Sequence, residues 1–245
     1  MKILTLNMHK GFTSFNRKFI LHELREAIRG SGADLVCLQE VLGDHQEHST
    51  RYEAWPAGPQ YEFLADTIWS NFAYGQNAVY PAGHHGNALL SKFPILRHQN
   101  HDVSTHDHER RGLLHSVLEI PSSGTELHVI CTHLGLTGGQ RMKQLNLLCD
   151  LIERDIPASD PVLVAGDFND WREKAHALLQ ERVGLQEVFI KAYGMAARTF
   201  PVQFPLLRLD RVYVRNLEVS HPEAHTGAPW SHLSDHAPLS LELQL

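Results

Sequence analysis

The sequence predicts a layered α/β fold, and two features of the 245-residue chain carry this prediction. Short apolar strands alternate with segments whose apolar residues recur at helical spacing, which is the pattern of helices packed on a sheet. Polar side chains follow at the carboxyl ends of several strands, where α/β proteins hold their chemistry. The clearest case is residues 162–169, in which four apolar residues precede Gly166, Asp167, Phe168 and Asn169.

The segment after Gly166 presents two polar side chains together. Alternate side chains of an extended segment point the same way, so we expect Asp167 and Asn169 to share a face while Phe168 turns back toward the core. A carboxylate beside a carboxamide suits a phosphate group and a hard cation. Gly-Asp after a strand is also common in plain turns, so the segment alone leaves both interpretations open.

The first strand of the chain also ends in a polar residue. Residues 2–7 form an apolar strand that ends at Asn7, which is either a turn residue or a site residue. His9, Lys10 and Gly11 follow directly. They form either a solvated loop or further contacts to a phosphate.

A helix and a second strand come next. Apolar residues recur at helical spacing over residues 15–29, with Ser14 as the N-cap and Gly30 as the stop. Residues 34–38 form another buried strand, and Glu40 stands beyond its carboxyl end. A glutamate at this place is either a solvated strand terminus or a metal ligand.

A loop, a helix and a hairpin follow the second strand. Residues 43–59 are polar and predict a long loop, whose length makes it a candidate for substrate contacts. Apolar spacing predicts a helix over residues 61–72. Two strands, at residues 78–80 and 87–91, are expected on either side of a turn at residues 83–86.

A second hairpin occupies the middle of the chain. Residues 113–120 alternate as a strand, residues 122–124 make the turn, and residues 126–133 return. His128 and His133 are an odd number of positions apart, so they face opposite sides of the sheet. We expect His128 to be structural.

The rest of the chain completes the alternation of helices and strands. Helices are predicted over residues 142–152 and 171–182, and strands over residues 186–190, 209–214 and 239–243. Alternation places Asp210 on an otherwise apolar face, where a buried carboxylate needs a partner. Arg208 and Arg211 are expected at the surface.

Composition limits the class of protein. Hydrophobic residues make up 42% of the chain and charged residues 20%, and no linker or repeat divides it, so we expect one domain over residues 1–245. The net charge of -6 disfavours tight non-specific binding to duplex DNA. Without an apolar signal segment or a transmembrane segment, the sequence predicts a cytoplasmic protein, which we expect to be a monomer.

Cysteine and histidine usage excludes two further kinds of site. Cys37, Cys131 and Cys149 are far apart and set among apolar neighbours, which favours reduced core thiols over a disulfide framework. The 18 histidines are accompanied by no pair of closely spaced cysteines and no His-Glu-x-x-His helix. They therefore do not predict a structural zinc site.

Seven short motifs recur in order along the chain. They are Asn7 in Leu-Thr-Leu-Asn, Glu40 in Leu-Gln-Glu, Asn87 in Gly-Asn-Ala-Leu-Leu-Ser, His133 in Thr-His-Leu, Asp167 and Asn169 in Gly-Asp-Phe-Asn, Asp210 in Leu-Asp-Arg-Val, and Asp235 and His236 in Ser-Asp-His. Together they resemble the motif series of the endonuclease/exonuclease/phosphatase superfamily. Its members include DNase I-like nucleases, apurinic-site endonucleases, neutral sphingomyelinases and inositol polyphosphate phosphatases.

The resemblance implies a fold and a reaction. The fold is a four-layer α/β sandwich, in which two packed mixed β-sheets are flanked by helices, as in DNase I. The reaction is metal-dependent hydrolysis of a phosphoester by direct attack of water. A serine hydrolase is disfavoured, because Ser234 lacks the glycine-flanked elbow of that class.

The resemblance also implies a metal site. Glu40 is the principal ligand, aided by Asp235 and by Asn7. Together with Asp167 these acids would repel one another in one cleft unless a cation joined them. Oxygen ligands beside a phosphate favour Mg²⁺, with Mn²⁺ as a substitute.

The catalytic roles follow from the same resemblance. Asp167 with Asn169 positions the water or assists the leaving group. His133 and His236 hold the scissile phosphate. Asp210 fixes the tautomer of His236, as a carboxylate does for a catalytic imidazole.

The substrate is the least determined part of the prediction. Contacts to it are expected from Asn87, Arg111, His9 and His85. A nucleic-acid diester is the first candidate, and a phospholipid, sphingomyelin or inositol phosphate is the alternative. Residues 202–207 are the one apolar loop that would suit a membrane, unless they belong to the core. A non-catalytic binding module on the same fold is the remaining alternative.

Overall fold

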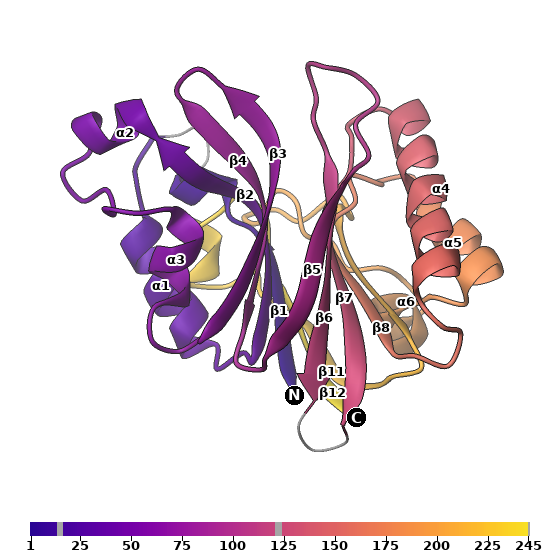
Figure 1. Ribbon diagram of the computed structural model, residues 1–245. Coiled ribbons are helices and arrows are strands. Elements are labelled where there is room, and N and C mark those ends of the chain that lie inside the picture. The colour runs from indigo at the N-terminus through magenta and orange to yellow at the C-terminus, as the bar shows by residue number, and fades with distance from the viewer. Residues whose placement is uncertain (14–16, 121–123, 245) are drawn as a thin grey trace.

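The computed structural model describes residues 1–13, 17–120 and 124–244, whose strands form two six-stranded sheets packed face to face (Figure 1). Helices cover the outer face of each sheet. This arrangement confirms the predicted four-layer α/β sandwich of two mixed sheets.

The first sheet contains the first and the last strand of the chain. Its members are β1 (Lys2–Asn7), β2 (Leu35–His45), β3 (Asn71–Tyr80), β4 (Gly83–Ser91), β11 (Glu218–Ala224) and β12 (Leu239–Gln244). Their order across the sheet is β11-β12-β1-β2-β4-β3. The pair β1 and β2 is parallel, and the other neighbouring strands are antiparallel.

The second sheet is built from the middle of the chain. Its members are β5 (Ile95–Asp102), β6 (Gly112–Ile120), β7 (Thr125–His133), β8 (Val162–Asp167), β9 (Gln186–Glu187) and β10 (Asp210–Arg215). Their order is β5-β6-β7-β8-β10-β9. Here β7 and β8 are the parallel pair, so each sheet has one parallel pair near its centre.

The helices vary widely in length. They are α1 (Leu21–Gly30), α2 (Gln46–Arg51), α3 (Gln60–Ala65), α4 (Gly138–Asp155), α5 (Ala175–Val183) and α6 (Val188–Tyr193), with the 3₁₀ turns η1 (His9–Gly11) and η3 (Trp230–His232). In the part of the chain that the structure describes, none of these helices is long and apolar enough to cross a membrane.

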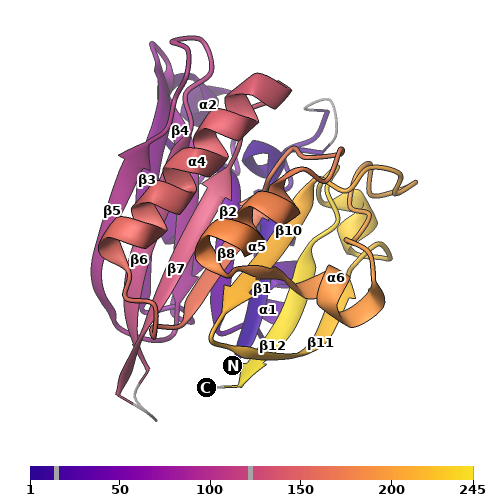
Figure 2. The ribbon, with the colours of Figure 1, turned by 90° about the vertical axis from the view of Figure 1, so that its right-hand side faces the viewer.

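Apolar side chains fill three layers of contact. Between the sheets, Leu89 of β4 packs in one buried cluster with Val129 of β7 and Leu163 of β8. On the outer face of the first sheet, α1 and α3 form a second cluster with β1, β2 and β4. On the opposite side, α4 and α5 cover β7 and β8 (Figure 2). Strand alternation thus buries both faces of each central strand.

The first predicted helix is shorter than expected. It begins at Leu21 rather than at residue 15, while the proposed cap Ser14 lies outside the described residues. The backbone before it is held in another way, because the Ile20 N–H donates to the Gly11 carbonyl at 2.9 Å. The Phe19 ring also packs on that of Phe12 at a centroid distance of 5.3 Å. Aromatic packing therefore overrides helical spacing here.

The segment between the second strand and the first hairpin also differs from the prediction. The strand runs on to His45, so α2 begins within the expected loop of residues 43–59. The helix expected over residues 61–72 ends at Ala65, and β3 begins at Asn71. The apolar residues that predicted one helix therefore belong in part to α3 and in part to β3.

The expected turn at residues 83–86 belongs to a strand. Gly83 pairs with Tyr80 and Gly86 with Gln76 across the β3–β4 hairpin. A Cβ at Gly86 would lie 1.8 Å from the carbonyl oxygen of Gly75. These glycines therefore mark close approach of the backbone rather than a reversal of the chain.

Two elements near the end of the chain have boundaries that differ from the prediction. The helix expected from residue 171 begins at Ala175, whose N–H donates to the Asp170 carboxylate at 2.7 Å. The strand expected over residues 186–190 ends at Glu187, because its carboxylate accepts the Ile190 N–H at 2.6 Å and starts α6. Glu187 is therefore the N-cap of α6, whereas the Asp170 carboxylate holds the first N–H of α5 from the preceding turn.

Two arginines that were expected at the surface are less exposed than predicted, and the cysteines are buried. Arg211 is not at the surface but is only 1% exposed, and its guanidinium donates to the Asp210 and Asp170 carbonyls at 3.0 and 3.1 Å. Arg208 is half-buried and pairs with Glu173 at 3.2 Å. All three cysteines are buried and unpaired, as predicted. Of the predicted turn at residues 122–124, only Gly124 is among the described residues.

Candidate active site

The site lies where the parallel strands of both sheets end. Asn7 is the last residue of β1, His133 of β7 and Asp167 of β8. In register, Asp167 pairs with His133 on one side and with Asp210, the first residue of β10, on the other. Three neighbouring strands therefore place these chemical groups in one row.

Asp167 is the centre of the row and is 2% exposed. Its Oδ2 accepts a hydrogen bond from the Asn7 amide at 3.1 Å, which links the two sheets. Its Oδ1 accepts from the backbone N–H of Asn169 at 2.9 Å. The Nε2 atom of His133 lies 3.5 Å from the same Oδ2. One carboxylate thus faces donors from three segments.

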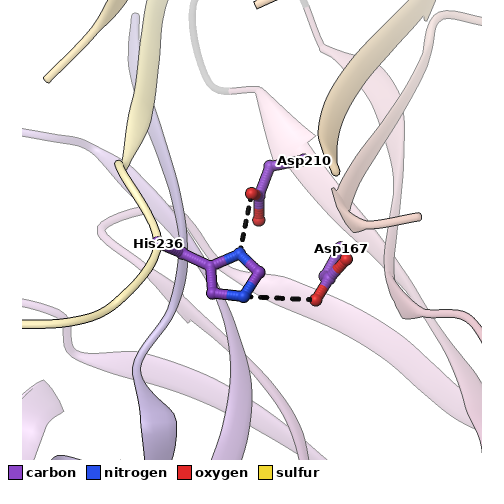
Figure 3. Close-up of side chains that lie close together, drawn as sticks. All are labelled: Asp167, Asp210 and His236. Carbon is purple, nitrogen blue, oxygen red and sulfur yellow. Dashed lines mark hydrogen bonds and ion pairs between the residues drawn. The ribbon is translucent and has the colours of Figure 1, made fainter. Parts of the chain in front are cut away.

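A second imidazole joins Asp167 to Asp210 (Figure 3). His236 Nδ1 lies 2.9 Å from Asp210 Oδ2, and its Nε2 lies 3.9 Å from Asp167 Oδ2. The buried Asp210 therefore has the partner that its place in β10 required. The Phe200 ring packs on this imidazole with a centroid distance of 5.0 Å.

Burial and neighbouring charges shift the pKa values of these groups in different directions. Burial raises the pKa of the Asp167 carboxyl to about 6. Burial lowers the pKa of His236, but the carboxylates of Asp210 and Asp167 outweigh it and raise this pKa to about 10. Burial, and then the Arg111 cation, hold the pKa of His133 well below its ordinary value. At neutral pH the site therefore has one charged and one neutral imidazole.

The predicted metal ligands line the more open side of the site. Glu40 Oε1 lies 3.5 Å from the Asn7 amide nitrogen, and its Oε2 lies 3.9 Å from Lys10 Nζ. Asp235 Oδ2 lies 3.6 Å from His9 Nδ1. The side chains of Glu40 and Asp235 are 20% and 19% exposed. This set of partly open oxygen atoms fits a hard divalent cation.

A different group satisfies a simple distance test for metal binding. Among the described residues, Asp167, Asp210 and His236 place ligand atoms within 4.8 Å of one another. The 2.9 Å hydrogen bond between His236 and Asp210 occupies two of those atoms. A cation at this point would have to break that bond, so the cluster fits proton handling better than metal ligation.

Four of the eight described non-glycine residues with positive φ lie at the site. His9, Lys10, Glu40 and Asn169 all have positive φ, between 45° and 59°. Such conformations cost energy in non-glycine residues and persist where the surrounding structure imposes them. Gly166 has φ 146°, and a Cβ there would lie 1.9 Å from the Thr132 carbonyl oxygen. The close approach of β7 and β8 at the site therefore requires glycine.

The predicted substrate contacts divide into two kinds. The Asn87 amide is buried and donates to the carbonyls of Gly112 and Cys131 at 3.0 and 3.3 Å. Arg111 donates to Leu134 O at 3.2 Å and pairs with a glutamate. Both side chains hold the backbone around the site.

The two histidines of that prediction keep unused atoms. His9 Nε2 and His85 Nδ1 are buried without a hydrogen-bond partner among the described residues. Burial also lowers the pKa of His85 to about 4. Buried polar atoms of this kind can accept a further hydrogen-bond partner, so the contacts predicted for these two histidines stay predictions.

Two residues at the site were assigned no catalytic or binding role from the sequence. The Ser234 hydroxyl donates to the Asn7 carbonyl at 2.6 Å and accepts the His236 N–H at 3.1 Å, so it ties the two ends of the chain together. Its place beside the Asp-His motif was the available signal. Phe200, which packs on His236, had no local signal because that contact is made through the fold.

Comparisons with known proteins agree with this arrangement. Uncharacterized protein YbhP of Escherichia coli (strain K12) is 57% identical over 244 residues, covering 100% of this chain and 96% of that protein. The crystal structure of D. rerio TDP2 with single-strand DNA product has a TM-score of 0.75 at 19% identity, covering 100% of this chain and 99% of that one. Mannosyl-6-phosphatase Bt3783 of Bacteroides thetaiotaomicron VPI-5482 has a TM-score of 0.73 at 15% identity, with 100% of both chains covered.

The two solved structures share the fold with this chain. A family model, described as Endonuclease/Exonuclease/phosphatase family, matches residues 4–236 and so spans nearly the whole sequence. The chain therefore belongs to the endonuclease/exonuclease/phosphatase family, a family of phosphoester hydrolases.

Proposed function

We propose that this chain hydrolyses a phosphodiester by direct attack of water, with a bound divalent cation. The observation that carries this proposal is the convergence of Asn7, His133, Asp167 and His236 from both sheets on one point. Hydrolysis needs a proton acceptor for the water and positive donors for the phosphate. The row of side chains supplies both.

His236 is the charged donor of the site. Its pKa of about 10 keeps it an imidazolium at neutral pH, and the bond from Nδ1 to Asp210 leaves Nε2 to face the phosphate. His133 is neutral, and with its proton on Nε2, which lies 3.5 Å from Asp167 Oδ2, it would add a second donor without a second charge. His133 ends β7 of the second sheet and His236 precedes β12 of the first, so the two imidazoles would hold the phosphate from both sheets.

Asp167 is suited to accept a proton from the attacking water. A carboxyl with a pKa of about 6 is mostly ionised at pH 7, yet it is basic enough to take a proton during the reaction. Hydrogen bonds from Asn7 and Asn169 fix its orientation. The Asn169 amide itself donates to Leu134 O at 2.9 Å, so the loop after β8 is held in place.

Glu40, Asp235 and Asn7 would hold the cation, with Mg²⁺ expected and Mn²⁺ as a substitute. A divalent ion supplies positive charge to the phosphate and to the departing oxygen. Lys10 lies beside Glu40, so the site retains a cation from the chain itself on the open side.

Two substrate classes have support. A nucleic-acid diester is supported by the likeness of fold to TDP2, which was solved with a single-strand DNA product. A phospholipid or inositol-phosphate diester is supported by an exposed apolar turn beside His236, which is described below. The reaction at the phosphate is common to both.

The test is hydrolysis of bis(p-nitrophenyl) phosphate, single-stranded and duplex DNA, RNA and phospholipid vesicles, with Mg²⁺ or Mn²⁺ and with EDTA. We expect turnover that EDTA abolishes and that Glu40→Ala or His236→Ala lowers by about 10²- to 10³-fold. The exposed residues Glu53 and His98 offer matched controls, so Glu53→Ala and His98→Ala should keep the wild-type rate. Folded protein without turnover or metal binding would favour the binding-module alternative.

A further inference from the structure

A turn of residues 199–208 lies beside the site and is apolar where it meets solvent. Phe204 is 77% exposed and Leu206 is 65% exposed, whereas Val202 of the same turn is 1% exposed. The stretch 201–207 contains no charged residue. Single exposed apolar side chains are ordinary on a protein surface, but large ones gathered on one turn mark a binding surface.

Backbone hydrogen bonds fix the shape of this turn. The N–H groups of Leu206 and Leu207 donate to the Phe200 carbonyl at 3.0 and 2.8 Å. The Phe204 N–H donates to the Pro201 carbonyl at 2.9 Å. The exposed side chains are therefore held outward by an ordered backbone and cannot pack inward without breaking these bonds.

The base of the turn is joined to the catalytic segment. The Val202 N–H donates to the Asp235 carbonyl at 2.8 Å, and the Phe200 ring packs on His236 at 5.0 Å. Asp210 follows the turn by only a few residues and binds the same imidazole. A surface that meets the turn would therefore lie next to the segment that carries Asp235 and His236.

Two arginines flank the apolar stretch. Arg198 precedes it and is exposed, and Arg208 follows it and is paired with Glu173 at 3.2 Å. The Thr199 N–H donates to the Leu207 carbonyl at 2.9 Å, which brings the two ends of the stretch together at its base. Because Glu173 already pairs with Arg208, the exposed Arg198 is the cation at the base of the turn that suits the anionic headgroups of a bilayer.

The composition of the tip favours a bilayer over a nucleic-acid strand. Platforms that stack bases present a series of flat rings along a cationic groove. The exposed tip has one ring, Phe204, and two aliphatic side chains, Leu206 and Leu207. Branched aliphatic groups enter acyl chains readily and offer no stacking face.

We propose that residues 201–207 insert into the surface of a phospholipid bilayer and present a headgroup phosphodiester to the active site. This assignment names the substrate class of the proposed reaction and rests on it. Phe204 and Leu206 enter the acyl region, while Arg198 faces the anionic headgroups. The active site then meets the phosphodiester from the membrane side.

The first experiment is co-sedimentation of the full chain with vesicles of phosphatidylcholine and phosphatidylglycerol. We expect Phe204→Ala/Leu206→Ala to lower the vesicle-bound fraction by about tenfold or more, given the apolar area removed. Val79→Ala/Leu96→Ala is the matched control, because these side chains are 67% and 48% exposed on β3 and β5. Circular dichroism and thermal unfolding of both variants verify folding. Wild-type protein that stays in the supernatant, or a turn variant that binds like wild type, would overturn the proposal.

The second experiment separates this proposal from the reaction itself. The turn variant should lose about tenfold in hydrolysis of vesicle phospholipid, yet hydrolyse bis(p-nitrophenyl) phosphate within about twofold of wild type. Loss of oligonucleotide binding in that variant, without vesicle binding by wild type, would assign the turn to base stacking instead. If turn-dependent vesicle binding persists while wild type hydrolyses no diester, the membrane surface stands and the proposed reaction is wrong.

Discussion

Two buried histidines, His236 at the candidate active site and His115 on the outer face of the second sheet, have pKa values shifted in opposite directions. At the active site, His236 binds the buried Asp210 at 2.9 Å and its pKa rises to about 10. On the outer face, His115 lies 2.9 Å from His128, and burial lowers the pKa of His115 to about 4.

The difference comes from the carboxylates and not from the depth of burial. Asp160 lies 3.6 Å from His128, and its side chain is 31% exposed, so water screens its charge. Asp210 is 3% exposed and in direct contact with its imidazole. The direct contact of His236 with a buried carboxylate therefore distinguishes it from the outer histidine pair.

The largest effect should come from removing the charge of that carboxylate. Asp210→Asn keeps the shape of the side chain but removes the anion that charges and orients His236, so kcat should fall by about 10²- to 10³-fold, as in His236→Ala. The measurement is metal-saturated turnover of bis(p-nitrophenyl) phosphate. Asp160→Asn makes the same change beside His128 and should leave turnover unaltered. Equal losses in the two variants would contradict the distinction between the clusters.

The pH dependence of hydrolysis should show both titrations of the active site. Activity needs ionised Asp167, so it is lost as pH falls through about 6. It also needs charged His236, so it is lost as pH rises through about 10. The test is kcat/KM from pH 5 to pH 10.5 at saturating Mg²⁺. The residual activity of Asp167→Asn should lack the acid limb, and an acid limb that persists there would assign it to another group.

Several residues of the candidate site were predictable from the sequence, because they stand at the end of a strand. Asn7, His133 and Asp167 follow apolar runs, and parallel strands end at the same edge. Asp210 was marked by its apolar neighbours, which required a buried partner. The identity of that partner came from the resemblance to a family, since alternation alone gives no contact between distant segments.

What the sequence did not reveal depends on contacts between distant segments. Alternation put Arg211 on the face opposite Asp210. It could not show that the Asp170 carbonyl lies there and accepts a hydrogen bond from the Arg211 guanidinium. An apolar run such as residues 202–207 suits a core or an exposed turn equally. The hydrogen bonds to the Phe200 carbonyl hold a turn in which Phe204 and Leu206 face solvent and Val202 is buried.

The smallest effect concerns stability at the outer histidine pair. His115 has a pKa of about 4 in the folded chain and an ordinary value near 6.5 when unfolded. Between these values the unfolded chain binds more protons, so stability is present above about pH 6.5 and is lost as pH falls toward 4. From pH 7 to pH 5 the loss of folding free energy attributable to this group is about 2 kcal/mol.

His115→Gln removes the titration while keeping a polar side chain, so urea unfolding at the two pH values should show a smaller loss of stability for this variant. His98→Gln, on the exposed side of the neighbouring strand, should lose as much as wild type. An equal loss in His115→Gln would mean that the pair is already charged in the folded chain, and the contrast with His236 would then disappear.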